Sequence, residues 1–371
     1  MYAEPTQVSV AADGTLWALY NMRLQDSKSD RLRRWDGAAW QTFDVPPPPI
    51  KRIKYPLHGE HPVDTALVVT SAQQAQVFNV VELARDSPSA QTITLGVVVH
   101  TFNAGRWRSE ILPVTHSTHV TDAGNDPVFA DGSWVILFGR RVLHWDGSSW
   151  QLHTLTTRDL DSSGAKVFSD DEAEPWAVVS RRMLDDHLLR WEGSGWREIG
   201  LPAPGPPSPR EDPEWEYNLW FLTDVVALGA HDVWALGDVT MSNLELEGNG
   251  PARSLAWHWD GDLWSCHWGP VDNLSHEHAE PDGAGGLWMT SARDLECPPS
   301  CGIRTTELLH LSEGRWTREQ LPVPDGCAAD VKALVRRPAS QEVYAVGDIY
   351  PDGEKTCRVP PPGRVALWRT G

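Results

Sequence analysis

The stretch 143–150, Leu-His-Trp-Asp-Gly-Ser-Ser-Trp, decides the fold because the chain repeats it. Apolar residues precede the turn pair Asp146-Gly147, and Trp150 begins the returning segment, a pattern typical of a β-hairpin. Close copies stand at 32–40, 189–196 and 257–264, weaker copies at 100–107 and 309–316, and a truncated copy at 365–368.

A second apolar segment, usually built on a tryptophan, precedes each hairpin. Asp-Val-Trp-Ala-Leu-Gly at 232–237 is an example, and a further short strand at 225–228 lies upstream of it. The unit therefore has four strands, A to D, and its recurrence predicts a β-propeller. The B strands are expected at 16–19, 65–69, 134–137, 176–179, 233–237, 287–289 and 343–347.

The sequence thus predicts an all-β fold, a seven-bladed β-propeller of four-stranded antiparallel blades, in one domain that spans 1–371. The last copy of the unit ends after its C strand, and we expect residues 1–5 to supply the missing strand and close the ring, because an open sheet edge would otherwise remain. The blades are expected at about 6–46, 47–114, 115–157, 158–204, 205–272, 273–324 and 325–371.

The composition limits the partners. The chain has 20 Trp against 7 Phe and 6 Tyr, so one structural position is being reused, and we expect these rings to be buried between blades. A net charge of −19 disfavours nucleic acids and anionic membranes and favours basic ligands, basic protein surfaces and metal cations. No apolar run approaches the roughly 20 residues of a membrane span. The first residues show no signal-peptide pattern, which predicts a cytoplasmic location, or secretion if a leader has been removed.

Two motifs, 232–237 and 144–150, resemble those of Trp-rich bacterial propellers, a family abundant in myxobacteria and loosely grouped with kelch and Asp-box repeats. The resemblance covers nearly the whole chain and implies the propeller fold. The regular Gly-Gly pair of kelch repeats and the Asp-box spacing are absent. No sialidase arginine triad and no galactose-oxidase copper set can be placed, so the resemblance implies no catalytic residues.

The long and variable segments of the sequence are expected on one face. In a propeller the B–C loops and the D–A connectors share a face, and the Asp-Gly turns lie on the other. Binding residues are commonly carried by variable loops on a rigid scaffold. The long segments are 70–96, 203–221, 239–253, 293–306 and 350–363.

Four of the five cysteines fall in that loop-rich set. Cys297 and Cys301 lie in the expected B–C loop of blade six, Cys327 in the next connector, and Cys357 in the B–C loop of blade seven. Three alternatives remain open: two disulfides, a zinc site of four thiolates, or unpaired thiols. Cys266 is expected to be packed in an outer strand.

Histidines and acids supply two further candidate sites. His276 and His278 alternate on an expected A strand, so both rings would face one side, as metal ligands require; otherwise they are polar residues at a solvated channel mouth. His116 and His119 are expected at the matching entry to blade three.

The segment 211–217 interleaves acids with aromatic residues, which suits a binding surface for a cation or a basic peptide, or else a solvated turn. Its residues of interest are Glu211, Glu214, Trp215 and Tyr217. Calcium and zinc are the candidate cofactors, and neither is required by a recognisable motif.

The favoured hypothesis is a non-catalytic binding or scaffold protein that recognises a protein or small-molecule partner with its loop-rich face. The first alternative is a metal-assisted hydrolase, lyase or cyclase of a bacterial biosynthetic pathway. The second is a carbohydrate-binding lectin, which would need exposed tryptophans. Phosphate-loop, dinucleotide and nucleophile-elbow motifs are all absent from the sequence.

Overall fold

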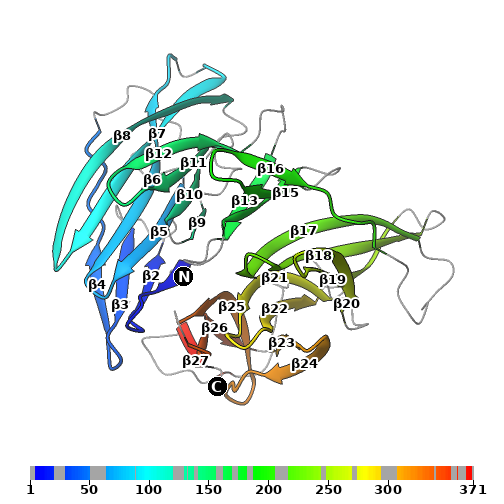
Figure 1. Ribbon diagram of the computed structural model, residues 1–371. Coiled ribbons are helices and arrows are strands. Elements are labelled where there is room, and N and C mark those ends of the chain that lie inside the picture. Colours follow the sequence, from blue (N-terminus) through cyan, green and yellow to red (C-terminus); the bar gives the residue numbers. More distant parts are fainter. Residues whose placement is uncertain are drawn as a thin grey trace. The chain divides into compact units, whose positions relative to one another are not determined.

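The fold is all-β and is that of a seven-bladed β-propeller, whose strands appear in Figure 1. Among the described residues no helix is long and apolar enough to cross a membrane. The computed structural model describes residues 5–20, 30–50, 64–87, 89–119, 129–131, 133–137, 141–155, 162–168, 174–181, 187–204, 216–243, 248–269, 274–293, 307–337, 340–351, 357 and 365–369.

The chain divides into two compact units, each of which is described by itself. The first comprises Met1–Ser169, Glu192–Arg197 and Arg337–Ala339, and the second comprises Asp170–Trp191, Glu198–Arg336 and Ser340–Gly371. Blades one to three belong to the first unit, blades five to seven belong to the second, and the division falls within blade four.

The blades of the first unit are antiparallel sheets in which each strand pairs with the next along the chain. Blade one is β1 (Pro5–Val10), β2 (Leu16–Tyr20), β3 (Arg31–Trp35) and β4 (Trp40–Asp44). Blade two is β5 (Asp64–Ser71), β6 (Gln74–Ala84), β7 (Thr92–Asn103) and β8 (Arg106–His119). Blade three is β9 (Phe129–Asp131), β10 (Trp134–Leu137), β11 (Arg141–Trp145) and β12 (Trp150–Thr154).

The same order of pairing holds in the remaining blades. Blade four is β13 (Ser162–Phe168), β14 (Trp176–Arg181), β15 (His187–Trp191) and β16 (Trp196–Ile199). Blade five is β17 (Glu216–Gly229), β18 (Asp232–Asn243), β19 (Gly248–Trp259) and β20 (Trp264–Trp268). Blade six is β21 (Leu274–Pro281), β22 (Leu287–Arg293), β23 (Glu307–Ser312) and β24 (Arg315–Gln320). Blade seven is β25 (Cys327–Arg336), β26 (Val343–Pro351) and β27 (Val365–Arg369).

The predicted ring closure is not confirmed. Blade seven has three strands among the described residues, and residues 1–4 lie outside them. Pro5 belongs to β1, where it is paired with Tyr20 of blade one. The closing strand therefore stays a prediction.

The Asp-Gly motif forms the C–D turns, as the sequence predicts. The Asp146 carboxylate accepts hydrogen bonds from the backbone N–H groups of Ser148 and Ser149, both at 2.8 Å. Gly147 has a φ of 93°, a left-handed conformation that favours glycine. Trp145 and Trp150 are paired across the turn with ring centroids 5.3 Å apart, so the hairpin is closed by an aromatic pair as well as by its turn.

The core contains a repeated aromatic contact between neighbouring blades. An aromatic ring on a B strand meets the tryptophan that opens the D strand of the next blade, edge to face. The pairs are Phe78 with Trp150 at 4.9 Å, Trp134 with Trp196 at 5.6 Å, and Trp176 with Trp264 at 6.5 Å between ring centroids. The predicted burial is confirmed for Trp17, Trp134, Trp176 and Trp234, whereas Trp288 is only half-buried.

Blade two differs from its prediction. Residues 65–69 belong to β5, the A strand, and the B strand is β6. The segment 70–96, expected to be a loop, contains β6 and the start of β7. The prediction failed because Phe78 takes the place that tryptophan holds in most other blades, so the sequence marker for the B strand is missing.

Two histidines of the same blade lie elsewhere than the sequence predicted. His116 and His119 lie in β8, opposite Leu95 and Thr92, and not at the entry to blade three. Pro113 does not end this strand, because β8 continues past it through a register irregularity at Gly96/Val97. Proline is tolerated there because β8 is an edge strand and has no further neighbour to which it must donate.

Candidate functional site

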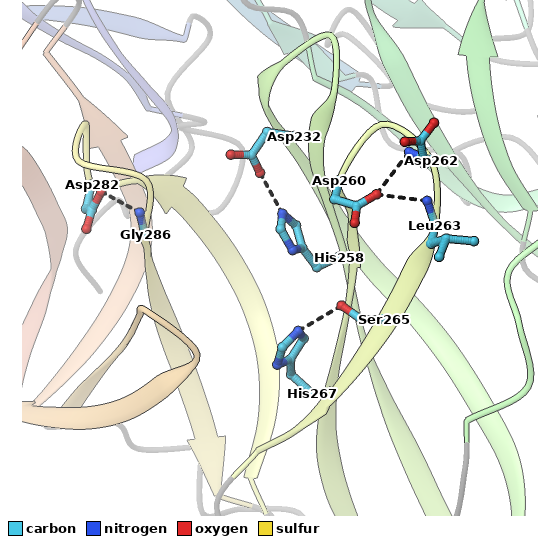
Figure 2. Close-up of polar contacts among 9 residues, drawn as sticks. All are labelled: Asp232, His258, Asp260, Asp262, Leu263, Ser265, His267, Asp282 and Gly286. Carbon is cyan, nitrogen blue, oxygen red and sulfur yellow. Dashed lines mark hydrogen bonds and ion pairs between the residues drawn. The ribbon is translucent and has the colours of Figure 1, made fainter.

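A set of three side chains recurs at the turn end of the blades, where the A–B and C–D turns lie. In blade five, His258 Nε2 donates to Asp232 Oδ1 at 2.9 Å (Figure 2), and the His258 ring stacks on the Trp234 ring with 4.1 Å between their centroids. Trp234 and His258 are register partners on β18 and β19, and Asp232 stands two residues before the tryptophan. Register alone therefore brings the three together.

Blades four, six and seven contain the same arrangement of acid, base and aromatic ring. The Arg190 guanidinium bonds to Glu174 at 2.7 Å and lies 5.6 Å from the Trp176 ring centroid. His310 Nε2 donates to Asp282 at 2.8 Å and stacks on Trp288 at 4.2 Å. Blade seven uses Glu342, Tyr344 and Arg369, with the ion pair at 3.4 Å.

This recurrence assigns the sets a structural role. A reaction centre needs one special constellation, whereas these sets tie the B strand to the C strand in four blades. In blades four, five and seven the acid stands two residues before the B-strand ring, whereas in blade six Asp282 stands six residues before Trp288. The base opposite the ring becomes visible only once the register is known. These residues were not among the predicted site residues.

Blade five also contains a second histidine and a serine beside the set, but they form no catalytic relay. Ser265 Oγ hydrogen-bonds to His267 Nε2 at 3.0 Å, whereas the Asp232 carboxylate is bound to His258 (Figure 2). The serine and the carboxylate therefore act on different imidazoles, and a Ser-His-Asp chain needs both on one ring. Burial, followed by the charge of His258, lowers the pKa of His267.

The carboxylate of Asp282 stabilises the A–B turn of blade six. Its Oδ1 accepts from the backbone N–H groups of Ala284 at 2.6 Å and Gly286 at 2.8 Å (Figure 2), and its Oδ2 accepts from His310. Burial alone would raise the pKa of Asp282, but the hydrogen bonds outweigh it and the pKa is lowered. The carboxylate is thus ionised and fully engaged in structure.

The predicted metal ligands His276 and His278 lie in β21. The prediction assumed strict alternation, but the register shifts between His276, opposite Ser291, and Ala279, opposite Met289. Such a bulge changes which face a side chain takes. The backbone N–H of His278 donates to Thr290 Oγ1 at 3.1 Å. Within the described part of the chain, no group of three His, Cys, Asp or Glu residues could hold a metal ion.

The cysteines of blade seven form one disulfide. Cys327, the first residue of β25, is bonded to Cys357, with their Cα atoms 4.9 Å apart. Sulfurs joined to each other are not thiolates, so this bond favours the disulfide alternative over a four-thiolate zinc site. Cys297 and Cys301 lie outside the described residues, and Cys266 is half-buried in β20.

The predicted acidic and aromatic segment adjoins an extension of blade five. The strands β17, β18 and β19 have 14, 12 and 12 residues, whereas β2, β3 and β4 have five each (Figure 1). At the B–C end, Tyr217 is paired with Met241 and Asn243 with Gly248. Glu211, Glu214 and Trp215 precede β17 and lie outside the described residues.

A buried arginine holds the base of this extension. Arg253 of β19 is 5% exposed, and its Nε and Nη2 donate to the carbonyl oxygen of Gly269 at 3.3 and 3.2 Å. Its guanidinium also lies 5.3 Å from the Trp268 ring centroid. A buried charge is tolerated only when it is satisfied in this way. The long hairpin therefore projects from a fixed support.

Comparisons with known proteins assign no activity. No protein-family model matches the chain, and no curated protein matches it. Leech intramolecular trans-sialidase matches with a TM-score of 0.43 and 9% identity, over 100% of this chain and 68% of that one. The GH93 α-L-arabinofuranosidase of Fusarium graminearum matches with a TM-score of 0.45 and 9% identity, over 99% and 92%. Aleuria aurantia lectin matches with a TM-score of 0.40 and 9% identity, over 86% and 96%.

Proposed function

We propose that the protein is a non-catalytic binding module that holds a basic protein segment at the B–C end of blade five. The observation that carries this proposal is the extension formed by β17, β18 and β19, which is longer than the strands of blade one and is supported by buried Arg253. Rigid strands that present variable connections are a common platform for recognition.

The chemistry of the partner follows from the sequence at the tip of the extension. The residues that enter β17 and those that connect β18 to β19 contain six acids and one arginine. The acids are Glu211, Asp212, Glu214, Glu216, Glu245 and Glu247, and the arginine is Arg210. Trp215 and Tyr217 stand among them, and aromatic residues are enriched in interface centres. Lysine and arginine side chains complement both the acids and the rings.

The alternatives receive less support. The lectin hypothesis required exposed B-strand tryptophans, but Trp288 is half-buried and four others are buried, namely Trp17, Trp134, Trp176 and Trp234. The metal-assisted enzyme hypothesis needs a metal site, and within the described part of the chain no group of three His, Cys, Asp or Glu residues could hold a metal ion. The recurring acid and base sets are explained by blade architecture.

The test is a calorimetric titration with two synthetic peptides of equal length, one rich in Lys and Arg and one rich in Glu. The wild type should bind the basic peptide, and the triple variant Glu211→Gln/Glu214→Gln/Glu216→Gln should bind it about tenfold more weakly, since a peripheral charge contributes up to about 1 kcal/mol. The control variant Asp44→Asn/Glu110→Gln/Glu319→Gln removes the same charge from exposed positions on β4, β8 and β24. Equal weakening in both variants, or no binding by the wild type, would overturn the proposal.

A further inference from the structure

The disulfide of blade seven encloses two whole strands. Cys327 is the first residue of β25, and Cys357 follows the end of β26 at Pro351, so the covalent loop of Cys327 to Cys357 contains β25, the A–B turn and β26. The Cα separation of 4.9 Å lies within the range that a disulfide ordinarily spans.

The bond lies where the strand ladder ends. Cys327 is paired with Pro351 across β25 and β26, and this is the last pair at the B–C end. Proline has no N–H group, so Pro351 cannot donate a hydrogen bond to β25 there. The disulfide therefore places a covalent link beside the last pair of the ladder, where the pairing of β25 and β26 ends.

The two cysteine residues differ in exposure. Cys327 is 7% exposed, whereas Cys357 is only half-buried. Thiol–disulfide exchange requires an attacking thiolate to reach one sulfur in line with the bond, and access decides which sulfur is attacked. The greater exposure of the Cys357 residue therefore favours attack at its sulfur, with Cys327 as the leaving group.

We propose that the Cys327–Cys357 bond is a redox-sensitive clasp, opened by a small-molecule thiol at Cys357, which loosens the β25–β26 hairpin. The thiolate of the small molecule attacks Cys357 Sγ; the new S–S bond forms as the Cys327–Cys357 bond breaks, and Cys327 leaves as a thiolate that takes a proton from water. A second small thiol attacks the sulfur of the first adduct, which releases Cys357 as a thiol and forms the disulfide of the small molecule.

The reduced state retains a partner for the buried sulfur. The carbonyl oxygen of Asp325 lies 3.9 Å from Cys327 Sγ, within the reach of a sulfur donor. The thiol of Cys327 thus gains an acceptor when the disulfide opens. The consequence of reduction falls on the hairpin, because the covalent closure of a loop with a sequence separation of 30 residues is lost.

The site of attack is tested by mass spectrometry in a background in which Cys266, Cys297 and Cys301 are replaced by serine. In that background, with Cys327 and Cys357 intact, the protein is treated briefly with reduced glutathione and the thiols released are then blocked with iodoacetamide. The attacked cysteine carries glutathione and the leaving one carries the alkyl group, so the adduct at Cys357 should be at least tenfold more abundant than the adduct at Cys327. Equal amounts, or more adduct at Cys327, would overturn the assignment of the attacked sulfur.

The effect on the hairpin is tested by hydrogen exchange of the same background with Cys327 and Cys357 intact, with and without reduced glutathione. Reduction should speed the exchange of the β25 and β26 amides at least tenfold and leave those of β6 and β7 in blade two unchanged. A Cys327→Ser/Cys357→Ser variant should exchange like the reduced protein and ignore glutathione. Unchanged exchange of β25 and β26 on reduction would contradict the clasp.

Discussion

The buried imidazole of His100 is a residue whose protonation should weaken the fold. Its side chain is fully buried in β7, where Nδ1 lies 2.8 Å from Ser109 Oγ and the ring meets Trp107. Burial lowers the pKa of His100 from 6.5 to about 4. The ring is therefore neutral in the folded protein at pH values where it is charged in the unfolded chain.

This shift predicts a pH dependence of stability. The unfolded chain binds a proton below pH 6.5 and the folded protein does so only near pH 4, so the stabilisation is fully present above 6.5 and is lost as the pH falls from 6.5 towards 4. The loss attributable to His100 should reach about 3 kcal/mol at 1.36 kcal/mol per pKa unit. Urea unfolding between pH 4 and 7 measures it. The variant His100→Gln should show a shallower slope, and an identical slope would contradict the prediction.

Single residues differ in how far their roles could be foreseen. The burial of Trp17 and Trp176 could be predicted because the same ring recurs at the same place in most blades. The bonds of His258 to Asp232 and of Arg190 to Glu174 could not, because their partners are distant in the chain and meet only through strand register. The Asp-Gly turns were predicted as turns. The hydrogen bonds that lower the pKa of their carboxylates, such as that of Asp146, appear only in the structure.

At the scale of strands and hairpins, stability should depend on the aromatic contact between blades. Trp176 of β14 is 2% exposed and packs edge to face on Trp264 of β20. Truncation of Trp176 to alanine should cost about 3–5 kcal/mol, because a cavity replaces a large buried ring. Equilibrium unfolding measures the loss. Leu263→Ala is the control, because Leu263 is 72% exposed in the β19–β20 turn and its truncation should change stability by less than about 0.5 kcal/mol.

A small effect of Trp176→Ala, similar to that of Leu263→Ala, would show that the ring does not hold the two blades together. The tryptophans of the B strands would then be free to serve a ligand. The comparison tests the structural role of the whole repeat, because the corresponding contacts of Phe78 and Trp134 have the same geometry.

The strands themselves could be predicted wherever the Trp and Asp-Gly markers are present. Blade two lacks the B-strand tryptophan, and there the prediction assigned the A strand β5 as the B strand and took β6 and the start of β7 for a loop. The extension of blade five was likewise hidden, because alternation in a polar and acidic stretch does not distinguish a strand from a solvated connection. Periodicity identifies strands only where one face is buried.

For the molecule as a whole, the number of blades and the antiparallel order of strands were predictable because each copy of the repeat specifies the same local structure. The candidate site was less predictable, since a repeat fixes a scaffold and leaves its connections unconstrained. Function is set by what the scaffold carries, and the fold alone does not assign it. The net charge of −19 is the one global property that points to a basic partner.

The measurement that tests this account most directly is the titration of the basic peptide into a protein whose blade-five extension has been shortened. Val239 and Arg253 are register partners on β18 and β19, so Asn-Gly can join them in a two-residue hairpin without disturbing the buried arginine. The account predicts that the shortened protein melts like the wild type and binds the peptide at least tenfold more weakly. Unchanged affinity in a folded, shortened protein would contradict it.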